Sequence, residues 1–256
     1  MTDLERLNKE YTAEDGLIDL RPEQRREPYE GQNKTTAGND NGILFRAYAV
    51  YLLFKRGGLT SQYEQDSLES IERLRDEVSG LTHRNPGRTG DKNSHDNLIG
   101  ELFIASFNEA GDEYIEFIHE YGAHNGWRFN NTGKREHERR SEIQPKDITL
   151  IKILYGIEPN KYHYAVFLLA ILFNAFQSPM RTSEHMMTAL RIEMAELYDY
   201  DLSPLYKILL TITSSIWRYA LHIKTKGRGL EQIYETYFKP SDHRHPLIGL
   251  AKGVKW

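Results

Sequence analysis

The chain has no cysteine, no long apolar run and no excess of basic residues. Without cysteine it has no disulfide, no thiolate ligand for a metal and no cysteine nucleophile. The longest apolar run, residues 164–173, is about half of what a bilayer-spanning helix requires, so we predict no membrane insertion. The formal net charge of -4 argues against binding to a phosphate backbone, so we predict no nucleic-acid partner.

Common catalytic and cofactor motifs are also missing. The sequence has no HExxH, EF-hand, Walker A or GxSxG motif, and the glycines of KGRGLEQ lack the rest of a dinucleotide-binding fingerprint. Asp242, His243 and His245 could chelate a cation, but we favour a surface turn before Pro246 as the explanation of this cluster. We therefore predict no metal and no cofactor.

The chain does contain helical periodicity. Apolar residues recur at helical spacing over 43–54 and 63–78, and Gly57 and Gly58 separate the two segments. Residues 94–111 and 112–126 repeat this design, and further helices are expected over 145–155, 162–177, 182–198, 203–224 and 230–237. Almost no segment alternates with period two, so strands should be scarce. We predict an all-α fold of consecutive αα-hairpins that form a partial or complete α/α toroid, with a stacked solenoid as the alternative.

Two parts are expected along the chain. Residues 1–38 are rich in charge and turn formers, include Pro22 and Pro28, and should form an extended N-terminal arm over the body. Leu17, Ile18 and Leu20 give this arm apolar surface to bury. Residues 39–256 should form the helical-hairpin domain.

The first two hairpins begin with similar polar residues. Asp40 and Asn41 open the first, and His95, Asp96 and Asn97 open the second. A ring of hairpins would bring these helix starts to one rim. Asp40, Asp96 and His95 are then candidate catalytic acids and bases, and Asn41 and Asn97 candidate hydrogen-bonding groups for a polar ligand. The alternative is that these residues only cap helices.

Two further segments carry groups suited to ligand binding. Arg84 and Arg88, in the loop RNPGR ahead of the second hairpin, could bind an anionic group, or could simply be solvated. In GWRFNN, Trp127 offers a stacking face, Arg128 a charge and Asn130 an amide, a combination typical of carbohydrate sites. Trp127 could equally anchor its loop in the core.

The chain resembles uncharacterised bacteriophage-encoded all-α proteins. The resemblance lies in the segments LIDLRPEQRREPYEG, GNDNGILF, RNPGR with SHDN, and HPLIGLAKG. The hairpin pattern is similar in type to six-hairpin glycosidases and polysaccharide lyases, which have more hairpins than this chain can hold. These resemblances imply a bacteriophage protein that binds or cleaves a glycan, is made in the host cytoplasm and is associated with the virion. The alternative is a noncatalytic virion structural or assembly protein whose partners are other virion subunits.

Overall fold

The structure is a computed structural model of the 256-residue chain. It describes residues 1–20, 41–76, 79–83, 95–130, 140–238 and 245–254, and for residues 128–130 and 140–142 it describes the backbone alone.

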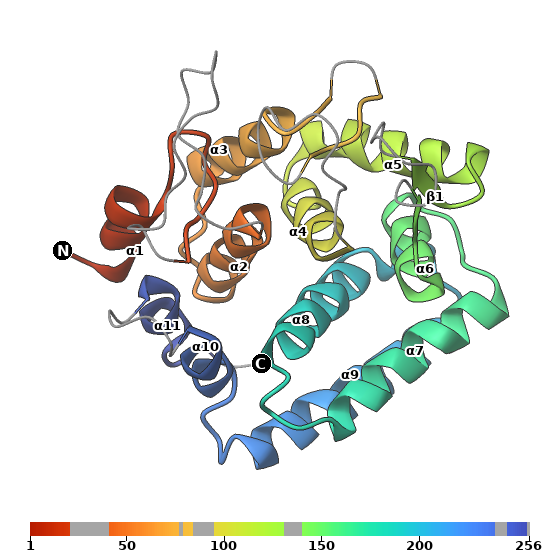
Figure 1. The fold of residues 1–256 in the computed structure, drawn as a ribbon. Coiled ribbons are helices and arrows are strands. Elements are labelled where there is room, and N and C mark those ends of the chain that lie inside the picture. The colour runs from red at the N-terminus through yellow and green to blue at the C-terminus, as the bar shows by residue number, and fades with distance from the viewer. Residues whose placement is uncertain (21–40, 77–78, 84–94, 131–139, 239–244, 255–256) are drawn as a thin grey trace.

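Helices dominate the described chain, and the all-α prediction is confirmed (Figure 1). One antiparallel pair of three-residue strands, β1 (Arg128–Asn130) and β2 (Arg140–Glu142), is the only sheet in the described ranges. The helices are α1 (Asp3–Arg6), α2 (Gly42–Lys55), α3 (Ser61–Glu72), α4 (His95–Ala105), α5 (Asp112–His124), α6 (Pro145–Leu154), α7 (Lys161–Phe176), α8 (Thr182–Leu197), α9 (Pro204–Lys224), α10 (Leu230–Phe238) and α11 (Pro246–Ala251), with shorter turns η1 (Leu7–Tyr11), η3 (Glu109–Gly111) and η4 (Asp199–Asp201).

Helices α2, α4 and α8 form the centre of the molecule, and α3, α5, α7 and α9 lie around them (Figure 1). Helix α2 is buried on nearly every side because residues 42–53 are apolar except for one arginine. That residue, Arg46, is satisfied inside the protein: its Nε donates to Ser67 Oγ at 2.8 Å and its guanidinium lies 4.0 Å from the centre of the Tyr63 ring. Helix α2 packs on α4, α4 on α8, and α8 on α10.

The close packing of α2 on α4 depends on Gly100. A Cβ atom at this position would lie 2.9 Å from Leu44 Cα and 3.3 Å from the carbonyl oxygen of Ile43. Both are backbone atoms of α2, which cannot move aside without separating the helices. A residue without a side chain is therefore required where the two central helices cross.

The first twenty residues pack on the C-terminal helices. Helix α1 contacts α11, and Leu17 and Ile18 are fully buried in the core. His245 lies stacked on Phe238 with ring centres 4.2 Å apart, and its Nε2 donates to the carbonyl oxygen of Asp19 at 3.0 Å. The two ends of the chain thus share one packed region.

Helices α7 and α9 lie side by side and run in the same direction along one edge of the molecule (Figure 1). Near their starts, Tyr164 stacks on Tyr206 with ring centres 4.0 Å apart. Near their ends, Lys224 Nζ donates to the carbonyl oxygen of Gln177 at 2.6 Å. None of the described helices combines the length and apolarity needed to cross a membrane.

We expect Gly100→Val to lower the free energy of unfolding by about 1–3 kcal/mol, the usual cost of overpacking a tight core. Urea denaturation measures this change. Gly58→Val is the control, because a Cβ there has no contact closer than 3.9 Å, and it should change stability by about 0.5 kcal/mol or less. Equal effects of the two substitutions would show that the α2–α4 contact does not require glycine.

Candidate functional site at the helix starts

A buried carboxylate joins the starts of α4 and α6 to the middle of α8. Asp147, the third residue of α6, is fully buried. Its Oδ2 accepts a hydrogen bond from His95 Nε2, at the first residue of α4, and its Oδ1 accepts one from Arg191 Nε of α8 at 3.0 Å. Arg191 is 3% exposed, whereas the His95 side chain is 27% exposed. The cluster therefore reaches from the core to the surface through His95.

The carboxylates around His95 favour its charged form. Its Nδ1 lies 3.4 Å from Asp96 Oδ1, so both ring nitrogens face a carboxylate. Because a carboxylate only accepts, Nε2 carries the proton, and Arg191 Nη2, at 3.2 Å, does not donate to it. Burial lowers the pKa of His95, but the hydrogen bonds to Asp147 and Asp96 outweigh burial and raise that pKa above its ordinary value.

The positive groups of the cluster keep Asp147 ionised. Burial raises the pKa of Asp147, but the Arg191 charge and the hydrogen bond from His95 overcome burial and hold that pKa below its ordinary value. Burial, followed by the charge of Arg191, lowers the pKa of the neighbouring Lys146. Among the described residues, no group of three or more histidine or acidic side chains is arranged to hold a metal ion.

The start of α2 lies beside the start of α4. Asn41 occupies the N-cap position of α2 but makes no side-chain capping bond. Its side chain instead hydrogen-bonds the Tyr237 side chain of α10, and the charge of Asp96 acts on the same tyrosine. Burial raises the pKa of Tyr237, and the hydrogen bond from Asn41 opposes that shift. The structure therefore brings together Asn41, His95 and Asp96, three of the residues that the sequence selected.

The other selected residues are placed differently or fall outside the description. Asn97 is fully buried in the first turn of α4, so its side chain does not face a ligand at the surface. Three candidates lie outside the described residues: Asp40, Arg84 and Arg88. Arg128 and Asn130 belong to β1, and their side chains are outside the description.

Trp127 packs beside the second half of α6, away from the His95 cluster. Its backbone has φ 60°, and a Cβ on Gly122 would come within 2.6 Å of its ring. Lys152 Nζ lies 5.9 Å from the ring centre, and the His119 ring centre lies 5.8 Å away. Lys152 is six residues beyond Lys146 on α6, which is roughly 9 Å along the helix axis. Trp127 thus anchors the end of α5 against α6.

A small cavity of about 200 Å³ lies next to the cluster, between α7, α8 and the start of α6. Lys146, Arg181 and Arg191 line it together with one carboxylate, Glu184. Lys146 connects the two regions, because the charges of Asp96 and Glu184 both act on it. The cavity wall therefore carries more positive than negative side chains.

Two amide side chains in this cavity have oxygens that accept nothing from the described protein. Asn174, which is 4% exposed, donates through Nδ2 to the carbonyl oxygen of Glu184 at 3.0 Å and to Thr188 Oγ1. Its Oδ1 has no described partner, and neither has Gln177 Oε1. Both residues line the cavity. An oxygen of this kind favours a ligand that can donate a hydrogen bond.

Asp147, Arg191 and Lys146 were not among the residues selected from the sequence. A signal was present in PKD at residues 145–147, where proline at the first helical position and an acid at the third mark the start of α6. Arg191 was harder to find, because the sequence does not show that this position of α8 is buried. Its pairing with a residue 44 positions away depends on the tertiary fold.

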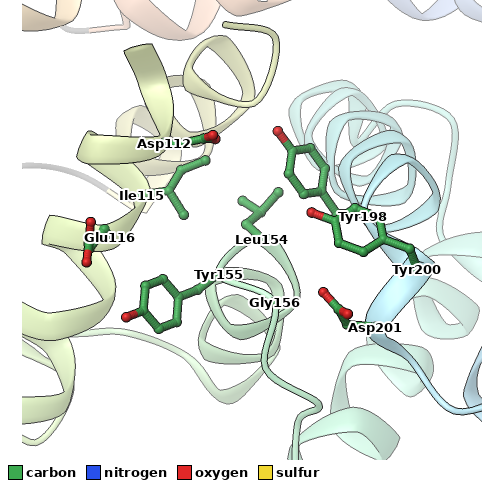
Figure 2. Close-up of a pocket in the computed structure, with 9 residues that line it drawn as sticks. All are labelled: Asp112, Ile115, Glu116, Leu154, Tyr155, Gly156, Tyr198, Tyr200 and Asp201. Carbon is green, nitrogen blue, oxygen red and sulfur yellow. The ribbon is translucent and has the colours of Figure 1, made fainter. Parts of the chain in front are cut away.

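A second cavity, of about 670 Å³, lies between α5, the end of α6 and η4 (Figure 2). Its polar lining consists of carboxyl and phenol groups, with no lysine or arginine. Tyr198 borders it and donates its hydroxyl hydrogen to the carbonyl oxygen of Ser106 at 2.9 Å, while burial raises the pKa of Tyr198 to about 12. The lining residues are Asp112, Ile115, Glu116, Leu154, Tyr155, Gly156, Tyr198, Tyr200 and Asp201. None of the residues selected from the sequence lies here.

Comparisons with known protein families, with curated proteins and with solved structures found no match to this chain. The site therefore has to be interpreted from its own geometry.

We expect Asp147→Asn to lower the free energy of unfolding by about 3–5 kcal/mol, because it leaves the buried Arg191 without its counter-charge. Adding Arg191→Met should restore part of the loss, since an apolar side chain of similar length needs no partner. Asp199→Asn, which removes an exposed ion pair with Lys207, is the control and should cost about 1 kcal/mol or less. Chemical denaturation of the four proteins tests the scheme, and equal losses from the two asparagine variants would contradict it.

The stabilisation by His95 should depend on pH. Its pKa in the folded protein lies above the unfolded value of 6.5, so its contribution is fully present below that pH and is lost as the pH rises through the folded pKa. The stability difference between wild type and His95→Asn should therefore shrink from mildly acidic to alkaline pH. His222→Asn, at an exposed position of α9, is the matched control. A difference for His95→Asn that grows with pH would contradict the ionic arrangement.

Proposed function

We propose that the protein binds an acidic glycan at the cavity beside the His95 cluster. The observation that supports this most is that cationic and amide side chains line the same cavity. Lys146, Arg181 and Arg191 suit a sugar carboxylate, and the amide side chains of Asn174 and Gln177, whose oxygens are buried without a described partner, suit sugar hydroxyls. A neutral sugar would leave the cationic groups unmatched, and a simple inorganic anion would leave the amide oxygens unmatched.

The size of the cavity limits what it can hold. Drug-sized ligand pockets occupy roughly 300–1,000 Å³, and this cavity of about 200 Å³ is smaller. It therefore suits one acidic residue of a glycan, with the remaining units outside it. Arg191 is already oriented by Asp147 through Nε, so its guanidinium would lose little freedom on binding.

Cleavage of the bound glycan stays a prediction, with His95 and Asp96 as the candidate catalytic acid and base. These two side chains are partly exposed and lie in contact with each other. Asp147 does not qualify as the second carboxylate of a hydrolase, because it is fully buried and bound to Arg191. Among the described residues Glu184 is the acid in the cavity wall, so binding is the function that the geometry supports better.

Two broader predictions are carried forward as part of this proposal. The first is a partial α/α toroid, which is supported by the meeting of the starts of α2, α4 and α6 around Asn41, His95 and Asp147. The second is a bacteriophage origin with association to the virion, which rests on the sequence resemblance alone. The alternative function is a noncatalytic virion structural or assembly protein, in which the charged cluster would only hold helices together.

The proposal predicts binding of oligogalacturonate, measured by isothermal titration calorimetry, with little binding of a neutral oligosaccharide of equal length. Lys146→Met should weaken affinity about tenfold or more, because a hydrogen bond to a charged group contributes roughly 1.5–3 kcal/mol.

Lys152→Met is the matched control, since this lysine lies on the same helix beside Trp127. It should leave affinity unchanged. Absence of binding across acidic surface polysaccharides and peptidoglycan fragments, with folded protein, would favour the noncatalytic alternative.

A further inference from the structure

The outer surface of α7 and α9 is covered with exposed apolar side chains. Between Tyr162 and Phe176 the chain has no charged residue, so α7 is apolar on its outer side as well as its inner side. A helix that is apolar all round is normally buried. The exposed apolar residues of this surface, here called the α7–α9 face, are Tyr162, Leu169, Phe173, Phe176 and Met180, and Leu205, Ile208, Leu209, Ile212, Ile216, Tyr219 and Ile223.

The spacing of these residues is that of helices that pack on other helices. On α9 they recur at positions 205, 209, 212, 216, 219 and 223, which alternates steps of four and three. On α7, positions 162, 169, 173 and 176 follow the same heptad spacing, and Met180 lies in the turn that follows the helix. This period of 3.5 residues is the pattern of a coiled-coil or bundle seam. The face therefore presents two neighbouring, parallel seams.

The area of the face is sufficient for a stable dimer. Its three aromatic side chains on α7 are 68–77% exposed, and aromatic side chains offer about 150–250 Å² each. With the aliphatic residues, the face exposes on the order of 1,000 Å² of apolar side chain. The largest apolar patch on a typical monomer is roughly 300–600 Å², and a stable interface buries about 800 Å² on each partner.

The charges around the face favour a protein over an anionic membrane. Neither α7 nor α9 contains an acidic residue, and the cations of α9 are already engaged within the chain. Lys207 Nζ lies 3.6 Å from Asp199, and Arg218 Nη1 donates to Glu196 at 3.0 Å. Lys224 caps the end of α7 by donating to Gln177. A lipid-binding helix would instead present free lysines and arginines on its polar side.

We propose that the α7–α9 face is the interface of a homodimer, in which it packs against the same face of a second copy. The two pairs of helices form a four-helix layer around a twofold axis, as an isologous interface requires. The face is apolar, and two of its neighbouring cations, Lys207 and Arg218, are paired with carboxylates, which limits like-charge repulsion between two copies. Phe173 belongs to this face and also borders the cavity proposed for the glycan, so the variants that test the dimer leave Phe173 unchanged.

Light scattering coupled to size exclusion tests the proposal with the full chain at micromolar concentration. Wild type should have twice the monomer mass of 29.9 kDa. The double substitution Leu169→Glu with Ile212→Glu should weaken dimerisation roughly hundredfold or more, because it places unpaired carboxylates in the interface. Circular dichroism should be unchanged, since both side chains are mostly exposed in the monomer.

Ile157→Glu is the matched control, because it changes an exposed isoleucine outside the face and should leave the dimer intact. Monomeric wild type, a dimer unaffected by the double substitution, or a monomer that binds phosphatidylglycerol vesicles through this face would each overturn the proposal.

Discussion

The ion network centred on Asp147 connects three helices that are distant in the sequence. A buried carboxylate is expensive unless it is paired and hydrogen-bonded, and here His95 of α4 and Arg191 of α8 supply both conditions. The network fixes the start of α6 relative to α4 and α8. It also determines which way Arg191 points, and therefore gives the adjacent cavity its positive wall.

His95 lies at the start of α4, where the helix dipole and the neighbouring carboxylates have opposite effects on its charged form. An imidazolium at the start of a helix is opposed by the positive end of the helix dipole. The carboxylates of Asp96 and Asp147 offset that opposition, so they favour the protonated form of His95 and raise its pKa. The same arrangement leaves His95 partly exposed, so a group needed for packing is also available to a ligand.

The sequence predicted those features of the structure that depend on residues close together in the chain. The apolar periodicity predicted the helices, and Asp96 and His95 were selected because polar residues gather at helix starts. The cavity could not be predicted in this way, because Lys146, Asn174 and Arg191 come from three helices whose packing depends on the whole fold. Trp127 was selected for its aromatic ring, but its place beside Lys152 is set by the chain turning after α5. The exposed outer side of α7 was equally hidden, since its composition is that of a buried helix.

The central claim is that the Asp147 network forms one side of a site for an acidic ligand. Nitrogen-15 NMR of the histidine ring tests it most directly, by following the pKa of His95 with and without oligogalacturonate. A ligand carboxylate bound at Lys146 and Arg191 adds negative charge near the imidazolium, so the pKa of His95 should rise further when the cavity is filled. A pKa of His95 that stays the same at saturating ligand, or that falls, would contradict the account.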